Sequence, residues 1–175
     1  ALREVLGAHV GPESSHTTGR RASLMLRAYT ALTGHMGVEA DVRAFKEADR
    51  RRLAEAIGLY KAWRGDLHAG LVRRLDTGDP AAVATMSGTP ARSLVSLALV
   101  DSPAHATPAP IRLAGLEPEA RYRVTLLNPS PAPRRSMKSW PGWMAGQPAE
   151  TLGALLMEAG ISPPILRAGE IALIA

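Results

Sequence analysis

The sequence of 175 residues contains no cysteine, which excludes disulfide bonds, Cys-ligated zinc, iron–sulfur clusters and a thiol nucleophile. Aromatic residues make up only 4% of the chain, too few for a platform on which nucleic-acid bases could stack. No apolar run reaches the roughly 18 residues that a transmembrane helix needs, and the first residues lack the pattern of a signal peptide. We therefore expect no membrane partner and a cytoplasmic protein.

Lysine is also scarce, with residues at positions 46, 61 and 138 only, so arginine supplies most of the positive charge behind the formal net charge of +5. The arginines are scattered apart from the run at residues 50–52, which falls on the solvated face of a predicted helix. Dispersed charge does not form the basic patch that nucleic-acid binding requires. We predict no nucleic-acid partner. The chain also lacks a glycine-rich phosphate loop and a G-x-S-x-G nucleophile elbow.

The apolar fraction of 46% and the charged fraction of 21% are those of a globular protein. Apolar residues recur at helical spacing over residues 22–34 and again over residues 47–65, and residues 38–48 are expected to connect these two helices. Two amphipathic helices cannot bury their apolar faces alone. Because the chain also begins at Ala1 and not at Met, we expect either a processed chain or a portion of a longer protein.

After residue 66 the helical spacing stops, and short apolar runs alternate with turns rich in Gly, Pro, Asn and Asp. This pattern is typical of an antiparallel β-sandwich or β-sheet domain. The runs predicted as strands are residues 71–75, 82–86, 94–100, 110–113, 122–127, 152–157 and 170–174. Residues 94–100 are apolar apart from Ser96, which predicts a strand buried on both faces. Residues 128–150 are predicted to form a long loop.

Several short segments follow one another in a distinctive order. They are Gly7-Ala8-His9-Val10, Ser15-His16-Thr17-Thr18-Gly19-Arg20, Gly34-His35-Met36-Gly37-Val38-Glu39-Ala40-Asp41, and residues 70–75, 120–124 and 153–157. In this ordered set the chain resembles the bacterial α-galactosidases of glycoside hydrolase family 36. The resemblance implies that residues 1–66 are the C-terminal end of a (β/α)8 catalytic barrel, followed by an all-β antiparallel domain at residues 67–175. Residues 5–10 would then be the last barrel strand and residues 22–34 the last barrel helix, with a further helix after them.

The resemblance also implies an activity, namely hydrolysis of terminal α-galactosides such as melibiose and raffinose with retention of configuration. It implies no cofactor and a homo-oligomer, which is a tetramer in the family. The family carries its nucleophile in a K-x-D motif and its acid/base in an S-D-x-x-D motif, and neither motif occurs in these residues. No catalytic residue is therefore assigned, and we expect the isolated chain to be inactive. The alternative is a non-catalytic carbohydrate-binding or structural β-domain module.

Active sites of (β/α)8 barrels lie at the carboxyl ends of the strands. His9, His16 and Arg20 would then lie at the edge of the substrate pocket. In the alternative, both histidines are structural and Arg20 pairs with Glu13 or Glu39. The two histidines lack a third ligand at a recognisable spacing, so no metal site is predicted.

Two further sets of residues have competing interpretations. Trp140 and Trp143 could stack on a sugar, although a Trp packed against the sheet is the commoner arrangement. Glu39 and Asp41 match neither catalytic motif and are interpreted as helix-end or surface residues.

Overall fold

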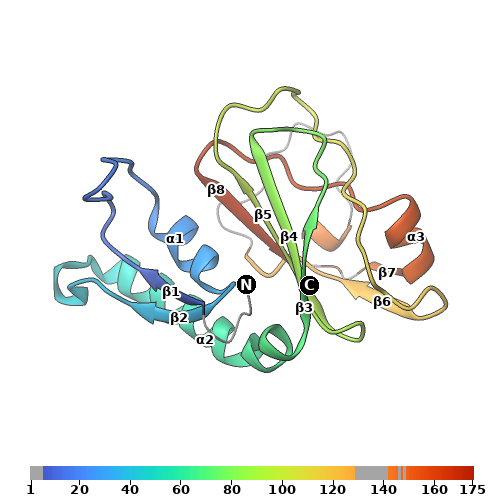
Figure 1. Cartoon of the computed structure of the whole chain (residues 1–175), viewed down its shortest axis with the longest axis horizontal. Helices are drawn as coiled ribbons and strands as arrows, with labels where there is room; N and C mark the ends of the chain where they lie inside the picture. Colours follow the sequence, from blue (N-terminus) through green and yellow to red (C-terminus); the bar gives the residue numbers. More distant parts are fainter. Residues whose placement is uncertain (1–5, 129–141, 146, 148) are drawn as a thin grey trace.

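The computed structural model describes residues 6–128, 142–145, 147 and 149–175. The first part of the chain alternates strand and helix: β1 (Gly7–Val10), α1 (Leu24–Ala31), β2 (His35–Val38) and α2 (Glu47–Ala69), with a 3-10 turn, η2 (Val42–Ala44), before α2. β1 and β2 are parallel neighbours in register from Gly7↔His35 to Val10↔Val38. Figure 1 shows the two strands side by side with α1 and α2 packed near them. This part therefore contains two successive strand–helix units.

The strand β2 corrects the prediction of a single strand followed by two helices. We interpreted Gly34 and Gly37 as the end of a helix and residues 38–48 as a connection. In the structure α1 already ends at Ala31, and residues 35–38 pair with β1. A strand of four residues is too short for its own periodicity to reveal it. Its identity comes from the pairing with β1, which a local pattern does not contain.

The second part is built on a four-stranded antiparallel sheet in the order β3-β4-β5-β8. Its strands are β3 (Leu71–Leu75), β4 (Ala82–Gly88), β5 (Ser93–Leu99) and β8 (Glu170–Ile174). A separate antiparallel pair is formed by β6 (Arg121–Val124) and β7 (Ala149–Leu152), and the 3-10 turn η3 (Gly142–Ala145) and α3 (Gly153–Glu158) complete this part. The predicted antiparallel sheet is thus present.

Two of the predicted strands are wrong. Residues 152–157 form the helix α3 over most of their length, and residues 110–113 contribute only an isolated bridge between Ile111 and Ile161. Short apolar runs do not distinguish a strand from a buried helical turn. At the start of this helix Gly153 approaches the neighbouring backbone closely, since a Cβ at this position would lie 2.1 Å from the backbone oxygen of Glu117.

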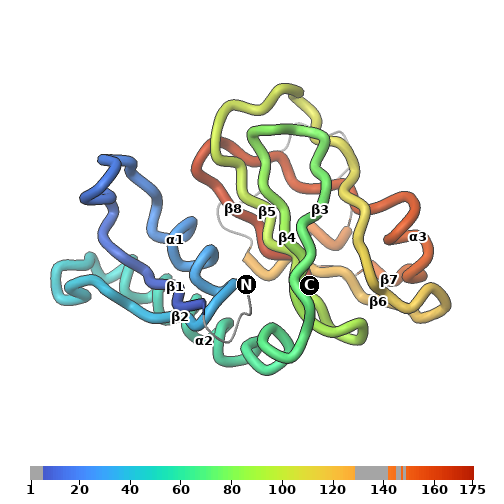
Figure 2. Tube along the Cα trace, viewed as in Figure 1, coloured from blue at the N-terminus to red at the C-terminus, as the bar shows by residue number. Residues whose placement is uncertain are grey.

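The four-stranded sheet has a hydrophobic core on each face. On one face Leu94 and Leu173 pack with residues of α1 and α2, and on the other Val95 and Leu97 pack with residues of β6 and α3. Figures 1 and 2 show the first part of the chain on one side of the sheet and β6, β7 and α3 on the other. The predicted burial on both faces is confirmed for Leu94, Val95 and Leu97, whereas Val100, just after β5, is exposed. The sheet is also the surface that buries the apolar faces of the two helices.

A polar clamp fastens α2 to the turn between β4 and β5. The guanidinium of Arg92 lies 3.9 Å from the centroid of the Trp63 ring and donates to Oδ2 of Asp66 at 2.7 Å. A cation over an aromatic face adds about 0.5–1 kcal/mol at exposed sites. The clamp therefore helps to hold the helical part against the sheet. Across the described ranges, no helix has both the length and the apolar character needed to cross a membrane.

Candidate functional site

The strand pair β1–β2 has one covered face and one open face. Ala8, Val10 and Met36 pack against α1 and α2. Side chains alternate along a strand, so His9 and its register partner Gly37 lie on the opposite face. The His9 side chain is 57% exposed there. Because both strands run the same way, their carboxyl ends meet at one edge, from which the loop of residues 11–23 leaves β1 (Figure 1).

The imidazole of His9 lies over the backbone of β2. A Cβ at Gly37 would be 2.7 Å from Cδ2 of His9 and 3.3 Å from its Nε2. The first of these distances is shorter than real Cβ atoms tolerate. A Cβ at Gly7, two residues before His9 on the same face, would be 3.8 Å from Nε2. The absence of a side chain at Gly37 therefore allows the ring to occupy this position.

Glu39 follows β2 directly and shares the open face with His9. Its backbone N–H donates to the carbonyl oxygen of Val10 at 3.1 Å, which continues the parallel ladder by one step. Its carboxylate oxygen Oε2 lies 3.5 Å from Nδ1 of His9, and the Glu39 side chain is 77% exposed. Glu39 is thus a surface residue, as predicted, but it lies at the carboxyl end of a strand and not at a helix end. Sequence reasoning missed this placement because it missed β2.

Asp41 has a local structural role. Its carboxylate accepts from the backbone N–H of Arg43 at 3.0 Å and from the Arg43 guanidinium at 2.9 and 3.1 Å. These hydrogen bonds, the guanidinium foremost, lower the pKa of the Asp41 carboxyl below its ordinary value. Asp41 is the N-cap of η2, which agrees with its interpretation as a helix-end residue.

His16 and Arg20 both lie on the loop of residues 11–23, and both are exposed. The expected alternative partners of Arg20 are engaged elsewhere. Glu13 binds the neighbouring Arg21, with Oε1 at 2.7 Å from Nη2, and Glu39 pairs with His9. The pairing of Arg20 with either carboxylate is therefore wrong, and the loop presents His16 and Arg20 to solvent at the same edge as His9.

Arg27 holds this loop and was not among the predicted site residues. From the first turn of α1 its guanidinium donates to the carbonyl oxygens of Gly11 and of Ala22, the latter at 3.1 Å. These two acceptors are the first residue after β1 and a residue just before α1. Burial lowers the pKa of the Arg27 guanidinium, against an opposing attraction from Glu13. Arg27 lies between two of the segments that resemble the family, and nothing in its spacing identifies it as an anchor.

We expect Arg27→Ala to loosen the loop of residues 11–23, because two carbonyl oxygens lose a charged donor. Hydrogen bonds to charged groups contribute about 1.5–3 kcal/mol. The backbone N–H of Ala22 donates to the carbonyl oxygen of Glu13 at 3.0 Å. In the variant this N–H should exchange with deuterium at least tenfold faster than in the wild type. Hydrogen exchange by mass spectrometry on the loop peptide measures this. Unchanged exchange in Arg27→Ala would contradict the anchoring role, and Arg92→Ala, far from this loop, is the control.

The two tryptophans proposed as sugar-stacking residues have different outcomes. Trp140 lies outside the described residues. Trp143 is in η3, is only 6% exposed and belongs to the core that contains Val124 and Leu156. A ring buried in this way has no free face for a sugar. The structure therefore places Trp143 in the packing arrangement.

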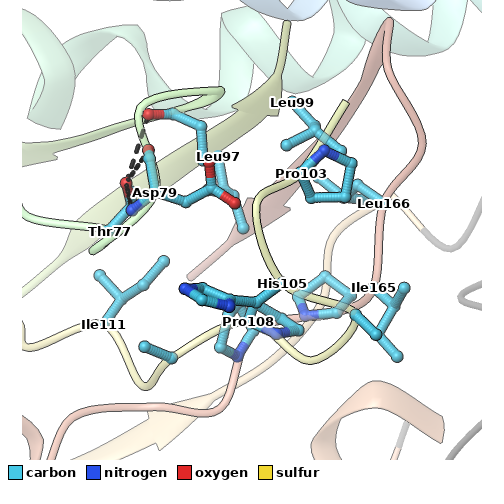
Figure 3. A pocket seen from close by; sticks show the side chains of 15 residues that line it. Thr77, Asp79, Leu97, Leu99, Pro103, His105, Pro108, Ile111, Ile165 and Leu166 are labelled. Carbon is cyan, nitrogen blue, oxygen red and sulfur yellow. Dashed lines mark hydrogen bonds between the residues drawn. The ribbon is translucent and has the colours of Figure 1, made fainter. Parts of the chain in front are cut away.

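A pocket in the second part of the chain, shown in Figure 3, is lined mostly by proline and aliphatic residues and offers about 50 Å³ to water-sized molecules. Its lining includes Leu97, Leu99, Pro103, His105, Pro108, Pro163, Pro164 and Leu166. The Asp79 carboxylate in its wall accepts from the backbone N–H groups of Ala81 at 2.8 Å and Ala104 at 2.9 Å. That carboxylate therefore ties loops together. An apolar pocket of this size does not suit a polyhydroxylated sugar.

Comparison with known proteins identifies the family. Residues 3–70 match the family model described as Melibiase, and residues 80–170 match that of the glycosyl hydrolase family 36 C-terminal domain. The chain belongs to glycosyl hydrolase family 36. No three His, Asp or Glu side chains converge as metal ligands in the part of this family 36 chain that the structure describes.

A curated relative and a solved structure each align along nearly all of this family 36 chain. It is 34% identical over 181 residues to an α-galactosidase of Escherichia coli, an alignment that covers 98% of this chain and 25% of the relative. The solved galactosidase domain of the α-galactosidase–sucrose kinase AgaSK superposes with a TM-score of 0.77 at 26% identity, covering 98% of this chain and 22% of that one. AgaSK is from Mediterraneibacter gnavus.

A variant of the α-galactosidase AgaA of Geobacillus stearothermophilus, solved in complex with raffinose, has the same fold. It superposes with a TM-score of 0.73 at 23% identity, covering 96% of this chain and 21% of that one. By its alignment with the E. coli α-galactosidase, the chain spans about a quarter of the length of that curated relative.

Proposed function

We propose that this chain is part of a retaining α-galactosidase that hydrolyses terminal α-galactosides of the melibiose and raffinose type. The parallel pair β1–β2 carries the proposal, since its carboxyl edge bears polar side chains on an uncovered face. The E. coli relative, an α-galactosidase aligned over 98% of this chain, and the raffinose complex of AgaA support the activity and the substrate class.

In this proposal the chain supplies two parts of the enzyme. The residues up to α2 are the end of a (β/α)8 catalytic barrel, in which β1 and β2 are two neighbouring strands, and the residues that follow are the C-terminal β-domain. We place the division at Gly70, slightly after the predicted boundary of 66 and 67, because α2 runs to Ala69. His9, His16 and Arg20 line the edge of the substrate pocket.

Retaining hydrolysis requires two carboxyl groups about 5–5.5 Å apart, one as nucleophile and one as acid/base. The carboxylates near the open edge match neither catalytic motif, and Glu13, Glu39 and Asp41 contact Arg21, His9 and Arg43 respectively. Both catalytic carboxylates would come from the rest of the barrel. This chain would shape the pocket and bind substrate, and it would be inactive by itself.

The test compares this 175-residue chain with the full-length enzyme that contains it, using p-nitrophenyl α-galactoside and raffinose. We expect turnover by the full-length enzyme, with α-galactose as the first product in the proton NMR spectrum, and none by the chain alone. A β-configured first product would overturn retention, and the absence of any galactoside turnover by the full-length enzyme would overturn the proposed activity. Turnover by the isolated chain would overturn its dependence on the missing carboxylates.

The alternative of a carbohydrate-binding β-module is weakened by the burial of Trp143. A tetrameric assembly and a cytoplasmic location remain predictions. Size-exclusion chromatography with light scattering on the full-length enzyme tests the first, and cell fractionation the second.

A further inference from the structure

We propose that Glu39 is a substrate-binding residue that accepts hydrogen bonds from sugar hydroxyl groups, and that His9 is the positioning residue that orients its carboxylate. The inference rests on the proposed function, because it places Glu39 in the substrate pocket of that enzyme. It assigns a role to a carboxylate that matches neither catalytic motif of the family.

The first step concerns the direction of Glu39. Residues 37 and 39 point to the same side of β2 because side chains alternate, and the hydrogen bond from the Glu39 N–H to Val10 keeps residue 39 in the ladder. The other side of the strand pair is packed against α1 and α2. The contact with His9, which lies on the open face, confirms that the carboxylate belongs to this face.

The second step concerns the space around the pair. The open face carries glycine at residues 7 and 37, so the imidazole of His9 is the large group between them. Since residues 7 and 37 have no side chain, neither of them stands between the His9–Glu39 pair and the interior of the proposed barrel. A ligand at the carboxyl edge can therefore approach the Glu39 carboxylate directly.

The third step concerns chemistry. An ionised carboxylate has two oxygens and only accepts hydrogen bonds, so it suits a neutral ligand with adjacent hydroxyl groups. An exposed glutamate has several rotamers, and a neighbour that restricts them lowers the entropy lost when the ligand binds. Nδ1 of His9, at 3.5 Å from Oε2, is positioned to do this.

The fourth step separates this role from a structural one. In this chain both side chains are more than half exposed, and an exposed side-chain pair of this kind contributes about 0–1 kcal/mol to stability. Removing the charge of Glu39 should therefore leave the fold intact. A loss of substrate affinity in Glu39→Gln would then report on binding.

The experiment uses the full-length enzyme and measures KM and kcat for melibiose and raffinose. We expect Glu39→Gln to raise KM about 10- to 100-fold with kcat within threefold, since a charged acceptor is lost. Glu39→Asp should recover part of this loss. His9→Asn should raise KM less, and the double variant should be no worse than Glu39→Gln within about threefold, because His9 acts through Glu39.

A matched control is Glu150→Gln on β7. Glu150 is also exposed and pairs with Arg123 at 3.3 Å, but it belongs to the β-domain. We expect unchanged KM and an unchanged melting temperature for this control. An unchanged KM in Glu39→Gln would overturn the inference, and so would a KM in the double variant equal to the product of the two single effects. In either case, turnover by the wild type would leave the proposed activity standing. Loss of wild-type galactoside turnover would instead overturn the proposed function.

Discussion

Replacing Gly70 by alanine is expected to destabilise the protein by at least about 3 kcal/mol. Gly70 joins α2 to β3, and a Cβ there would lie 1.9 Å from the carbonyl oxygen of Gly88 and 2.0 Å from its carbon. Both obstacles are backbone atoms of β4, so no side chain can rotate away and the strand itself must move. Overpacking a close contact costs about 1–3 kcal/mol, and more where the backbone is displaced.

The sign of this prediction is informative because φ at Gly70 is −96°, a value that alanine adopts without strain. Without the steric contact, alanine would stabilise the protein by restricting the unfolded chain. Gly58 provides the matched control within α2, since a Cβ there meets nothing within 4 Å. Gly58→Ala should stabilise the protein by about 0.5–1 kcal/mol through helix propensity.

Urea unfolding followed by tryptophan fluorescence measures both variants, because Trp63 and Trp143 lie in the cores on opposite faces of the sheet. We expect a large loss in the midpoint for Gly70→Ala and a small gain for Gly58→Ala. A Gly70→Ala protein as stable as the wild type would show that α2 and β4 do not approach each other at this junction.

Helix α2 illustrates what the sequence alone could specify. Its start at residue 47 was predicted, because apolar residues recur from there at helical spacing. Its buried face was predicted only in part. The spacing predicts one apolar stripe with Leu53 and Arg64 on it and Trp63 beside it. Leu53 and Trp63 are buried as expected, but Arg64 is exposed and the buried face continues to Leu67. Both sides of this helix offer apolar residues, so the choice between them depends on where the four-stranded sheet lies, which the helix sequence does not record.

The candidate site shows the same limit from another direction. The motif Gly7-Ala8-His9-Val10 correctly suggested a strand that ends at Val10. The neighbouring strand β2 was hidden because a parallel partner is separated from β1 by a whole helix. Glu39 was therefore interpreted as a helix-end or surface residue, and its place beside His9 was missed. Long-range pairing, and not local propensity, brings these two residues together.

Replacing Asn128 by alanine is the second change from which we expect a large effect, a loss of about 2–5 kcal/mol. Asn128 is buried, and its side chain bonds to the backbone of β8 as a neighbouring strand would. Its Nδ2 donates to the carbonyl oxygen of Ile171 at 2.8 Å, and its Oδ1 accepts from the N–H of Leu173 at 2.5 Å. Alanine would leave one buried donor and one buried acceptor without these partners, and each costs about 1–3 kcal/mol.

The same urea titration tests this change, with Gln147→Ala as the control. Gln147 carries an exposed amide, so its loss should change the stability by less than about 0.5 kcal/mol. Asn128→Asp keeps an acceptor for Leu173 but replaces the donor to Ile171 by a buried negative charge, so it should be at least as destabilising as alanine near pH 7.

If Asn128→Ala were neutral, β8 would have to be held by its pairing with β5 and its buried side chains alone. The amide of Leu173 should then remain protected from exchange in the variant. We expect instead that this amide loses protection, because Asn128 is the group that satisfies it.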